Sequence, residues 1–364
     1  MTRLTRADLD GLPSYVPGRN LADLTRELGI AEAIKLASNE VPYGPLPGVV
    51  EAVTEVMLGS HRYPDMGVVE LRDALAGRLG VAADRIVTGC GSVALAETLV
   101  KATCLPGDEM VYAWRSFEAY PIVAAGVGAT SVRVANTPDH GHDLAAMADA
   151  ITDQTRLVVV CNPNNPTGTA LRRAEIDRFL SRVPSDVLVV LDEAYREMVT
   201  DPDVPDAIQT YADRPNVVVL RTMSKAWGLA GLRMGYLVAQ PEVAAAIRKV
   251  LTPFSTSLVA QAAALAALQQ EDEVRRRCAL VVSERDRVTE ALRKLGVEVP
   301  DSQANFVWLP LGDRAAAFGT ACENRGVIVR AFHPDGVRVT IGTPAENDQF
   351  LAAAEAALDL PGRS

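Results

Sequence analysis

The sequence has 364 residues, of which 48% are hydrophobic and 23% charged, and its formal net charge is −10 at pH 7. This composition is typical of a globular protein with one or two domains. The acidic balance and the lack of lysine or arginine runs argue against a nucleic-acid partner, because phosphate binding needs clustered cations. No apolar stretch is long enough to span a bilayer, so we expect no membrane partner.

The five cysteines are scattered, at positions 90, 104, 161, 278 and 322, without a Cys-x-x-Cys pair. Their odd number and their spacing favour reduced thiols over disulfides or a zinc site. The first residues lack the apolar core of a signal peptide. We therefore predict a cytoplasmic protein without a metal site.

Turn residues and prolines dominate residues 1–44, which we expect to form a loop-rich arm. Within it, Leu21 to Leu28 could form a helix and Ile34 to Ala37 a short strand. The cluster of prolines and glycines at 42–48 then predicts a domain boundary or a segment that crosses a cleft.

Helix and strand patterns alternate from there to about residue 250. Short, continuous, β-branched runs predict buried strands at Arg85–Thr88, Glu109–Ala113, Thr130–Val134, Leu157–Val160, Val187–Leu191, Val217–Leu220 and Tyr236–Ala239. Helices are expected at Val49–Leu58, Val68–Leu79, Val93–Thr103 and Arg173–Arg182. The alternation predicts an α/β fold whose mostly parallel, seven-stranded sheet carries helices on both faces.

The rest of the chain is richer in helices. Helices are predicted at 241–251, 257–270, 272–295, Asp313–Asn324 and Pro344–Leu358, and strands at Gln303–Pro310, Val327–Phe332 and Gly336–Ile341. We predict a large α/β domain at 45–250 and a smaller, discontinuous α+β domain made of 1–44 and 251–364.

Polar residues follow three of the predicted strands. They are Asn165, Asp192, Tyr195, Thr222, Ser224 and Lys225. Parallel pairing would bring them to one edge of the sheet, which is where open α/β sheets bind ligands. A lysine buried at that edge must be paired, deprotonated or covalently used.

Each of these residues also has an ordinary structural interpretation. Asn165 lies in an Asn-Pro-Thr-Gly turn, and Asp192 could cap a helix. Tyr195 could fill space, and Lys225 could extend to solvent from a loop. Their expected convergence at one edge favours a functional site.

The segment Gly89-Cys90-Gly91-Ser92-Val93-Ala94 lies between a predicted strand and a predicted helix and fits the dinucleotide pattern G-x-G-x-x-A. A dehydrogenase is rejected because the next strand lacks an acidic residue at its end, and because Lys225 and Asp192 would have no role. Free N–H groups at a helix start nevertheless suit any phosphate.

Three motifs, in this order and spacing, resemble fold-type-I pyridoxal-phosphate aminotransferases. They are Asn165-Pro166-Thr167-Gly168, Asp192-Glu193-Ala194-Tyr195, and Ser224-Lys225 followed by 228–233. The segments 62–65 and 336–342 narrow the resemblance to the histidinol-phosphate aminotransferase branch. The segments 12–18, 35–40 and 114–117 are similar to the aromatic amino-acid aminotransferases of that branch. The resemblance covers nearly the whole chain and is more specific for the cofactor than for the substrate.

The resemblance implies roles toward pyridoxal 5′-phosphate. Lys225 would hold it as a Schiff base and then act as the base for the Cα proton, while Asp192 would pair with the ring nitrogen. Asn165 and Tyr195 would hydrogen-bond the ring oxygen, and Phe117, or a neighbouring aromatic residue such as Trp114 or Tyr120, would stack on the ring. The phosphate would be bound by Gly91, Ser92, Thr222, Ser224 and Arg233, and by Tyr63 of a second subunit.

The role of Tyr63 implies a homodimer with shared active sites, although Tyr63 could also be a plain turn residue before Pro64. On the substrate side, Arg338 would bind the α-carboxylate, unless it faces solvent between inward-facing valines. Arg330 could serve a substrate phosphate, a second carboxylate or a surface ion pair. Tyr15 and Asn39 would line the side-chain pocket.

We therefore predict an aminotransferase that moves an amino group from an aromatic amino acid to a 2-oxo acid such as 2-oxoglutarate. One alternative is histidinol phosphate as the donor, in histidine biosynthesis. A second is a pyridoxal-phosphate decarboxylase or lyase on the same scaffold. A third is a non-catalytic regulatory protein, which would normally carry a DNA-binding segment, and this sequence gives no signal for one. The donor preference stays open because loops from two chains would shape the pocket.

Overall fold

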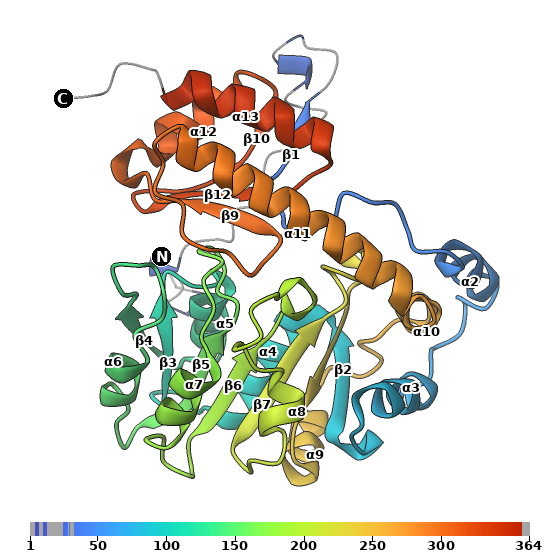
Figure 1. Ribbon diagram of the computed structural model, residues 1–364. Helices are drawn as coiled ribbons and strands as arrows, with labels where there is room; N and C mark the ends of the chain where they lie inside the picture. The colour runs from blue at the N-terminus through green and yellow to red at the C-terminus, as the bar shows by residue number, and fades with distance from the viewer. Residues whose placement is uncertain (1–3, 7–9, 13–24, 28, 30–32, 359–364) are drawn as a thin grey trace.

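The computed structural model describes residues 4–6, 10–12, 25–27, 29 and 33–358 (Figure 1). Its main feature is a seven-stranded sheet with the order β2-β8-β7-β6-β5-β3-β4. The strands are β2 (Ile86–Cys90), β3 (Glu109–Trp114), β4 (Thr130–Ala135), β5 (Thr155–Cys161), β6 (Leu188–Asp192), β7 (Val217–Thr222) and β8 (Met234–Val238). Within this sheet β8 runs against its neighbours β2 and β7, and the other pairings are parallel. The predicted mostly parallel, seven-stranded sheet is confirmed.

Helices cover both faces of this sheet, because alternate residues along its strands enter two different apolar cores. In β5, Val158 and Val160 belong to one core, and Leu157 and Val159 belong to the other. The first core includes residues of α3 (Val69–Leu79), α6 (Leu144–Asp149), α7 (Arg173–Leu180) and α8 (Ala207–Tyr211). The second includes residues of α4 (Gly91–Thr103), α5 (Ala119–Val127) and α9 (Pro241–Val250). Burial on both sides explains why the strands are continuous apolar runs.

The C-terminal part lies over one edge of the large sheet (Figure 1). Its elements are α10 (Leu258–Leu268), α11 (Glu271–Lys294), β9 (Phe306–Leu309), α12 (Ala315–Glu323), β10 (Val327–Ile328), β11 (Arg330–Phe332), β12 (Gly336–Thr340) and α13 (Pro344–Leu358). β10 pairs with β1 (Ile34–Lys35) near the start of the chain. This pairing agrees with the predicted association of the N-terminal arm with the C-terminal unit, and the proposed domain limits stay a prediction.

Some predicted elements differ from the structure. The single strand Val327–Phe332 is wrong: it divides at Val329, because β10 pairs with β1 whereas β11 pairs with β12. The helix predicted at Val93–Thr103 begins at Gly91. Most of the helix predicted at Leu21 to Leu28 lies outside the described residues. In the part of the chain that the structure describes, no helix is both long and apolar enough to cross a bilayer.

Candidate functional site

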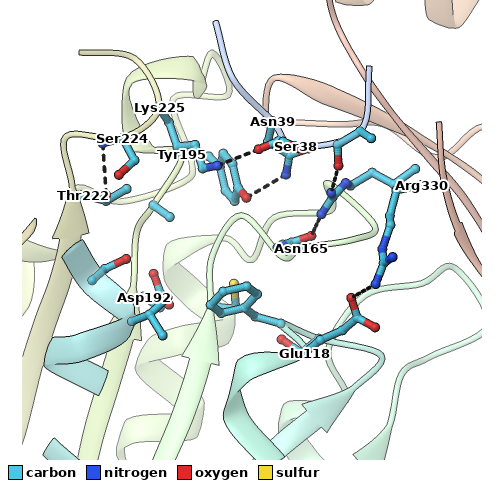
Figure 2. A pocket seen from close by; sticks show the side chains of 18 of the residues that line it. Ser38, Asn39, Glu118, Asn165, Asp192, Tyr195, Thr222, Ser224, Lys225 and Arg330 are labelled. Atoms are coloured by element: carbon cyan, nitrogen blue, oxygen red, sulfur yellow. Dashed lines mark hydrogen bonds and ion pairs between the residues drawn. The ribbon is translucent and has the colours of Figure 1, made fainter. Parts of the chain in front are cut away.

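The carboxyl ends of β2, β5, β6 and β7 meet at one edge of the sheet, together with the beginning of β8. The strand register sets Cys161 beside Asp192, and Thr222 beside Gly235. Loops that leave this edge, together with the N-terminal segment and the C-terminal sheet, line a cavity of about 310 Å³ (Figure 2).

Most of the predicted site residues line this cavity. They are Asn39, Ser92, Phe117, Asn165, Asp192, Tyr195, Thr222, Ser224, Lys225, Arg233, Arg330 and Arg338. Gly91 lies beside it, against Arg233. Tyr15 lies outside the described residues. Parallel pairing of the strands thus places the polar strand ends together, as their positions in the sequence predicted.

Lys225 extends into the cavity, where its Nζ donates a 3.0 Å hydrogen bond to the carbonyl oxygen of Ser38 (Figure 2). Burial and the positive charge of Arg338 lower the pKa of the amine to about 8. About a tenth of such an amine is neutral at pH 7, which suits a nucleophile or a general base. The interpretation of Lys225 as a lysine that extends to the surface is therefore wrong.

Asp192 ends β6, and only 4% of it is exposed. Its Oδ2 accepts a 2.8 Å hydrogen bond from the Tyr120 hydroxyl, whereas its Oδ1 has no partner among the described residues. Burial raises the pKa of Asp192 to about 6, although the hydrogen bond from Tyr120 opposes this rise. The helix-cap interpretation is wrong, because the short helix that follows begins only at Arg196. A buried carboxylate with an unsatisfied oxygen fits a cationic ligand.

Arg338 on β12 points into the cavity and is 8% exposed, so the solvent-facing interpretation is wrong. Its Nη1 lies 2.5 Å from the Asn165 side-chain oxygen, and its Nη2 lies 2.6 Å from the Ala37 carbonyl oxygen. Nearby, the Tyr195 hydroxyl accepts a 2.8 Å hydrogen bond from the Asn39 side-chain amide. A buried guanidinium in this position can bind a carboxylate in bidentate fashion.

A glycine-lined turn lies where β2 runs into α4. Gly91 has a φ of 79°, and a Cβ there would collide with the Arg233 guanidinium. A Cβ at Gly235 would lie 2.5 Å from the Ser92 nitrogen, so glycine lets β8 approach the start of α4. The N–H groups of this helix start, together with Ser92, Thr222, Ser224 and Arg233, can hold a phosphate.

The aromatic side chains near the cavity have separate positions. Phe117 lines the cavity, as does Phe332 from β11. Trp114 lies instead between two guanidiniums, 4.8 Å from that of Arg115 and 4.5 Å from that of Arg133. Neither Trp114 nor Tyr120 lines the cavity, so Phe117 is the one of these three aromatic residues that can cover a flat ligand.

Sequence reasoning missed three contacts in this site. Ser38 accepts a hydrogen bond from Lys225, and Tyr120 donates one to Asp192. Glu118 forms a 2.8 Å ion pair with Arg330 inside the cavity. The available signal for Glu118 was its place directly after Phe117, at the end of the segment 114–117 that is similar to aromatic amino-acid aminotransferases.

The family model "Aminotransferase class I and II" matches residues 31–353. The chain belongs to this family. The aminotransferase is 57% identical over 350 residues to an aromatic amino acid aminotransferase of Streptomyces coelicolor, with 96% of each chain covered. It is 56% identical over 354 residues to a Rhodococcus jostii protein of the same name, with 97% of this chain and 96% of that one covered.

A solved structure agrees with this assignment. The histidinol-phosphate aminotransferase from Sinorhizobium meliloti, determined in complex with pyridoxal-5′-phosphate, matches the aminotransferase with a TM-score of 0.88 at 28% identity, and the match covers 98% of each chain. The predicted fold-type-I architecture and enzyme class are confirmed, and the non-catalytic alternative is not supported.

Tyr63 of the aminotransferase lies away from the cavity of its own chain, in the segment between α2 (Val49–Met57) and α3. It is 82% exposed, and its ring stacks on Phe254 with a centroid separation of 4.5 Å. A role for Tyr63 at a cofactor phosphate would therefore need a second subunit.

Proposed function

We propose that this enzyme transfers the amino group of an aromatic amino acid to a 2-oxo acid such as 2-oxoglutarate, with pyridoxal 5′-phosphate as the cofactor. The observation that carries the proposal is the convergence of Lys225, Asp192 and Arg338 on one cavity beside an anion site. The names of the relatives from Streptomyces and Rhodococcus support an aromatic donor over the histidinol-phosphate and decarboxylase alternatives.

The residues of the cavity fit the cofactor. The unpartnered, buried Oδ1 of Asp192 would face the protonated ring nitrogen, and Lys225 would hold the cofactor covalently. Asn165 and Tyr195 would hydrogen-bond the ring oxygen, and Phe117 would cover the ring. The phosphate would be held by Gly91, Ser92, Thr222, Ser224 and Arg233. When bound there, the cofactor supplies a sink for the electron pair that remains when the substrate Cα loses its proton.

The protein side chains would supply orientation and proton transfer. Arg338 would bind the substrate α-carboxylate, which fixes the direction of the Cα–H bond. The Lys225 amine, with its lowered pKa, would accept the Cα proton. Asn39 and Tyr15 would contribute to the side-chain pocket.

Visible absorption tests the cofactor and the donor together. The purified enzyme should show the band of a covalently bound cofactor; phenylalanine should replace it with the absorption of the aminated cofactor, and 2-oxoglutarate should restore it. Histidinol phosphate is tested in a parallel sample. A missing band would remove the cofactor assignment, and conversion by histidinol phosphate but not by phenylalanine would overturn the aromatic donor.

We further propose a homodimer in which Tyr63 reaches the cofactor phosphate of the other subunit. Exposed apolar side chains support it, because several belong to α2, to the segment between α2 and α3, to the first residue of α3 and to the loop before α10. They are Val50, Met57, Leu58, Tyr63, Met66, Val69 and Phe254. Large apolar patches of this kind mark interaction sites.

The cytoplasmic location also stays a prediction.

Leu58→Glu tests the dimer, since Leu58 is 86% exposed and a charge there would oppose burial against a second copy. Sedimentation should show a dimeric wild type, a largely monomeric variant, and cofactor affinity lowered by about tenfold. Leu105→Glu is the matched control, because Leu105 is 73% exposed after α4. A monomeric wild type, or equal dissociation in both variants, would contradict the dimer.

A further inference from the structure

Three guanidiniums lie near the Phe332 ring at the C-terminal wall of the cavity, and two of them, those of Arg330 and Arg338, belong to residues that line it. The Arg338 and Arg330 guanidinium carbons lie 5.5 and 5.2 Å from the centroid of Phe332. A substrate anion that binds Arg338 and extends further would therefore meet Arg330. A single carboxylate can be matched by one guanidinium, whereas a doubly charged phosphate is best matched by two.

The charge of Arg330 is already matched within the protein. Its Nη2 lies 2.8 Å from Oε2 of Glu118, and both residues line the cavity (Figure 2). The side chains are 16% and 29% exposed, so water screens this pair less than a surface pair. A phosphate that approached Arg330 would have to displace Glu118 or accept its negative charge as a close neighbour.

We propose that Glu118 is a specificity-determining residue, which makes the cavity favour amino acids with a single carboxylate and an uncharged side chain over substrates that carry a phosphate. This inference rests on the proposed function, because it concerns the substrate of the same cavity. Phe117 and Phe332 give the neighbouring walls their aromatic surface, which suits an aromatic side chain. Glu118 thereby separates two substrate classes that Arg338 alone would bind alike.

A neighbouring ion pair provides a control. Arg115 Nε lies 2.5 Å from Oδ2 of Asp335, so this pair also joins the segment after β3 to the C-terminal sheet. Neither residue lines the cavity. The Arg115 guanidinium carbon lies 5.8 Å from the Phe332 centroid, on the cavity wall. Asp335→Asn removes one connection between these two segments and leaves the residues that line the cavity unchanged.

The test compares two inert ligands that share a phenyl ring and a three-carbon chain and differ in charge, 3-phenylpropanoate and 3-phenylpropyl phosphate. Calorimetry on the cofactor-loaded enzyme gives their dissociation constants. Glu118→Gln should strengthen phosphate binding relative to propanoate binding by at least about tenfold. Glu118→Ala removes any hydrogen bond that a glutamine could still make to Arg330. It should therefore show this gain even where Glu118→Gln does not. The ratio of kcat/KM for histidinol phosphate to that for phenylalanine should rise in parallel.

Two further variants make the test specific. The double variant Glu118→Gln with Arg330→Met should not show stronger phosphate binding relative to propanoate binding, because the guanidinium that would bind the phosphate is absent. Asp335→Asn should change the ratio less than about twofold. An unchanged ratio in both Glu118 variants, or an equal shift in Asp335→Asn, would overturn the role of Glu118. A wild type that fails to convert phenylalanine would instead defeat the proposed function, so the two failures are distinguishable.

Discussion

Lys225→Ala should lower the rate of amino-group transfer by at least about 10⁴-fold, because it would remove both the proposed covalent attachment point and the proposed base for the Cα proton. The amine is suited to this role because burial, with the positive charges of Arg338 and Arg233, lowers its pKa to about 8. Single-turnover absorption measurements with phenylalanine give the rate directly, since they follow the half-reaction without the second substrate.

Lys101→Ala is the control for this change. Lys101 lies on α4 in an exposed pair with Glu97, far from the proposed chemistry, and its replacement should leave turnover within about twofold of wild type. The Lys225 variant should still bind the cofactor, because Gly91, Ser92 and Arg233, which we propose hold its phosphate, are unchanged. Turnover by Lys225→Ala within tenfold of wild type would remove Lys225 from the mechanism.

The sequence predicted the strands and their polar ends because both signals are local. A strand buried on two faces needs a continuous apolar run, and Asp192 and Thr222 stand where two such runs stop. Parallel topology then brings residues of different loops to one edge without further information. This is why the sequence alone predicts that Asn165, Asp192 and Lys225 lie together.

What could not be predicted depends on contacts between distant segments. Tyr120 and Asp192 are 72 residues apart, and Ser38 and Lys225 are 187 residues apart. A solvent-facing Arg338 stayed open beside the substrate-binding role that the resemblance implied, because alternation along β12 does not reveal that Ala37 and Asn165 cover that face. The division of the strand at Val329 has the same origin, since its two halves pair with different partners.

Asp192→Asn should lower activity by at least about a hundredfold while making the cofactor-free protein more stable. Activity falls because asparagine cannot supply the charge that would keep the cofactor ring nitrogen protonated. Stability rises because the buried, ionised carboxylate destabilises the folded protein. The rise in its pKa from the ordinary 3.8 to about 6 means that the free energy of unfolding of wild type is lowered by about 3 kcal/mol above pH 6. The asparagine side chain would also be buried with an unsatisfied polar atom, which retains part of this destabilisation. We therefore expect the free energy of unfolding to increase by about 1–2 kcal/mol.

The pH dependence of this gain has a definite sign. The folded protein binds the Asp192 proton more tightly than the unfolded chain, so wild type pays no penalty below pH 3.8 and loses stability as the pH rises toward 6. Urea unfolding of the cofactor-free proteins measures the free energy of unfolding. The difference in this free energy between Asp192→Asn and wild type should rise from pH 3.8 to about pH 6 and stay constant above that. Asp186→Asn, at an exposed position before β6, should show no such gain. Because a cationic ring nitrogen would match the carboxylate, saturating cofactor should remove the advantage, and an advantage that persisted would contradict the pairing of Asp192 with that nitrogen.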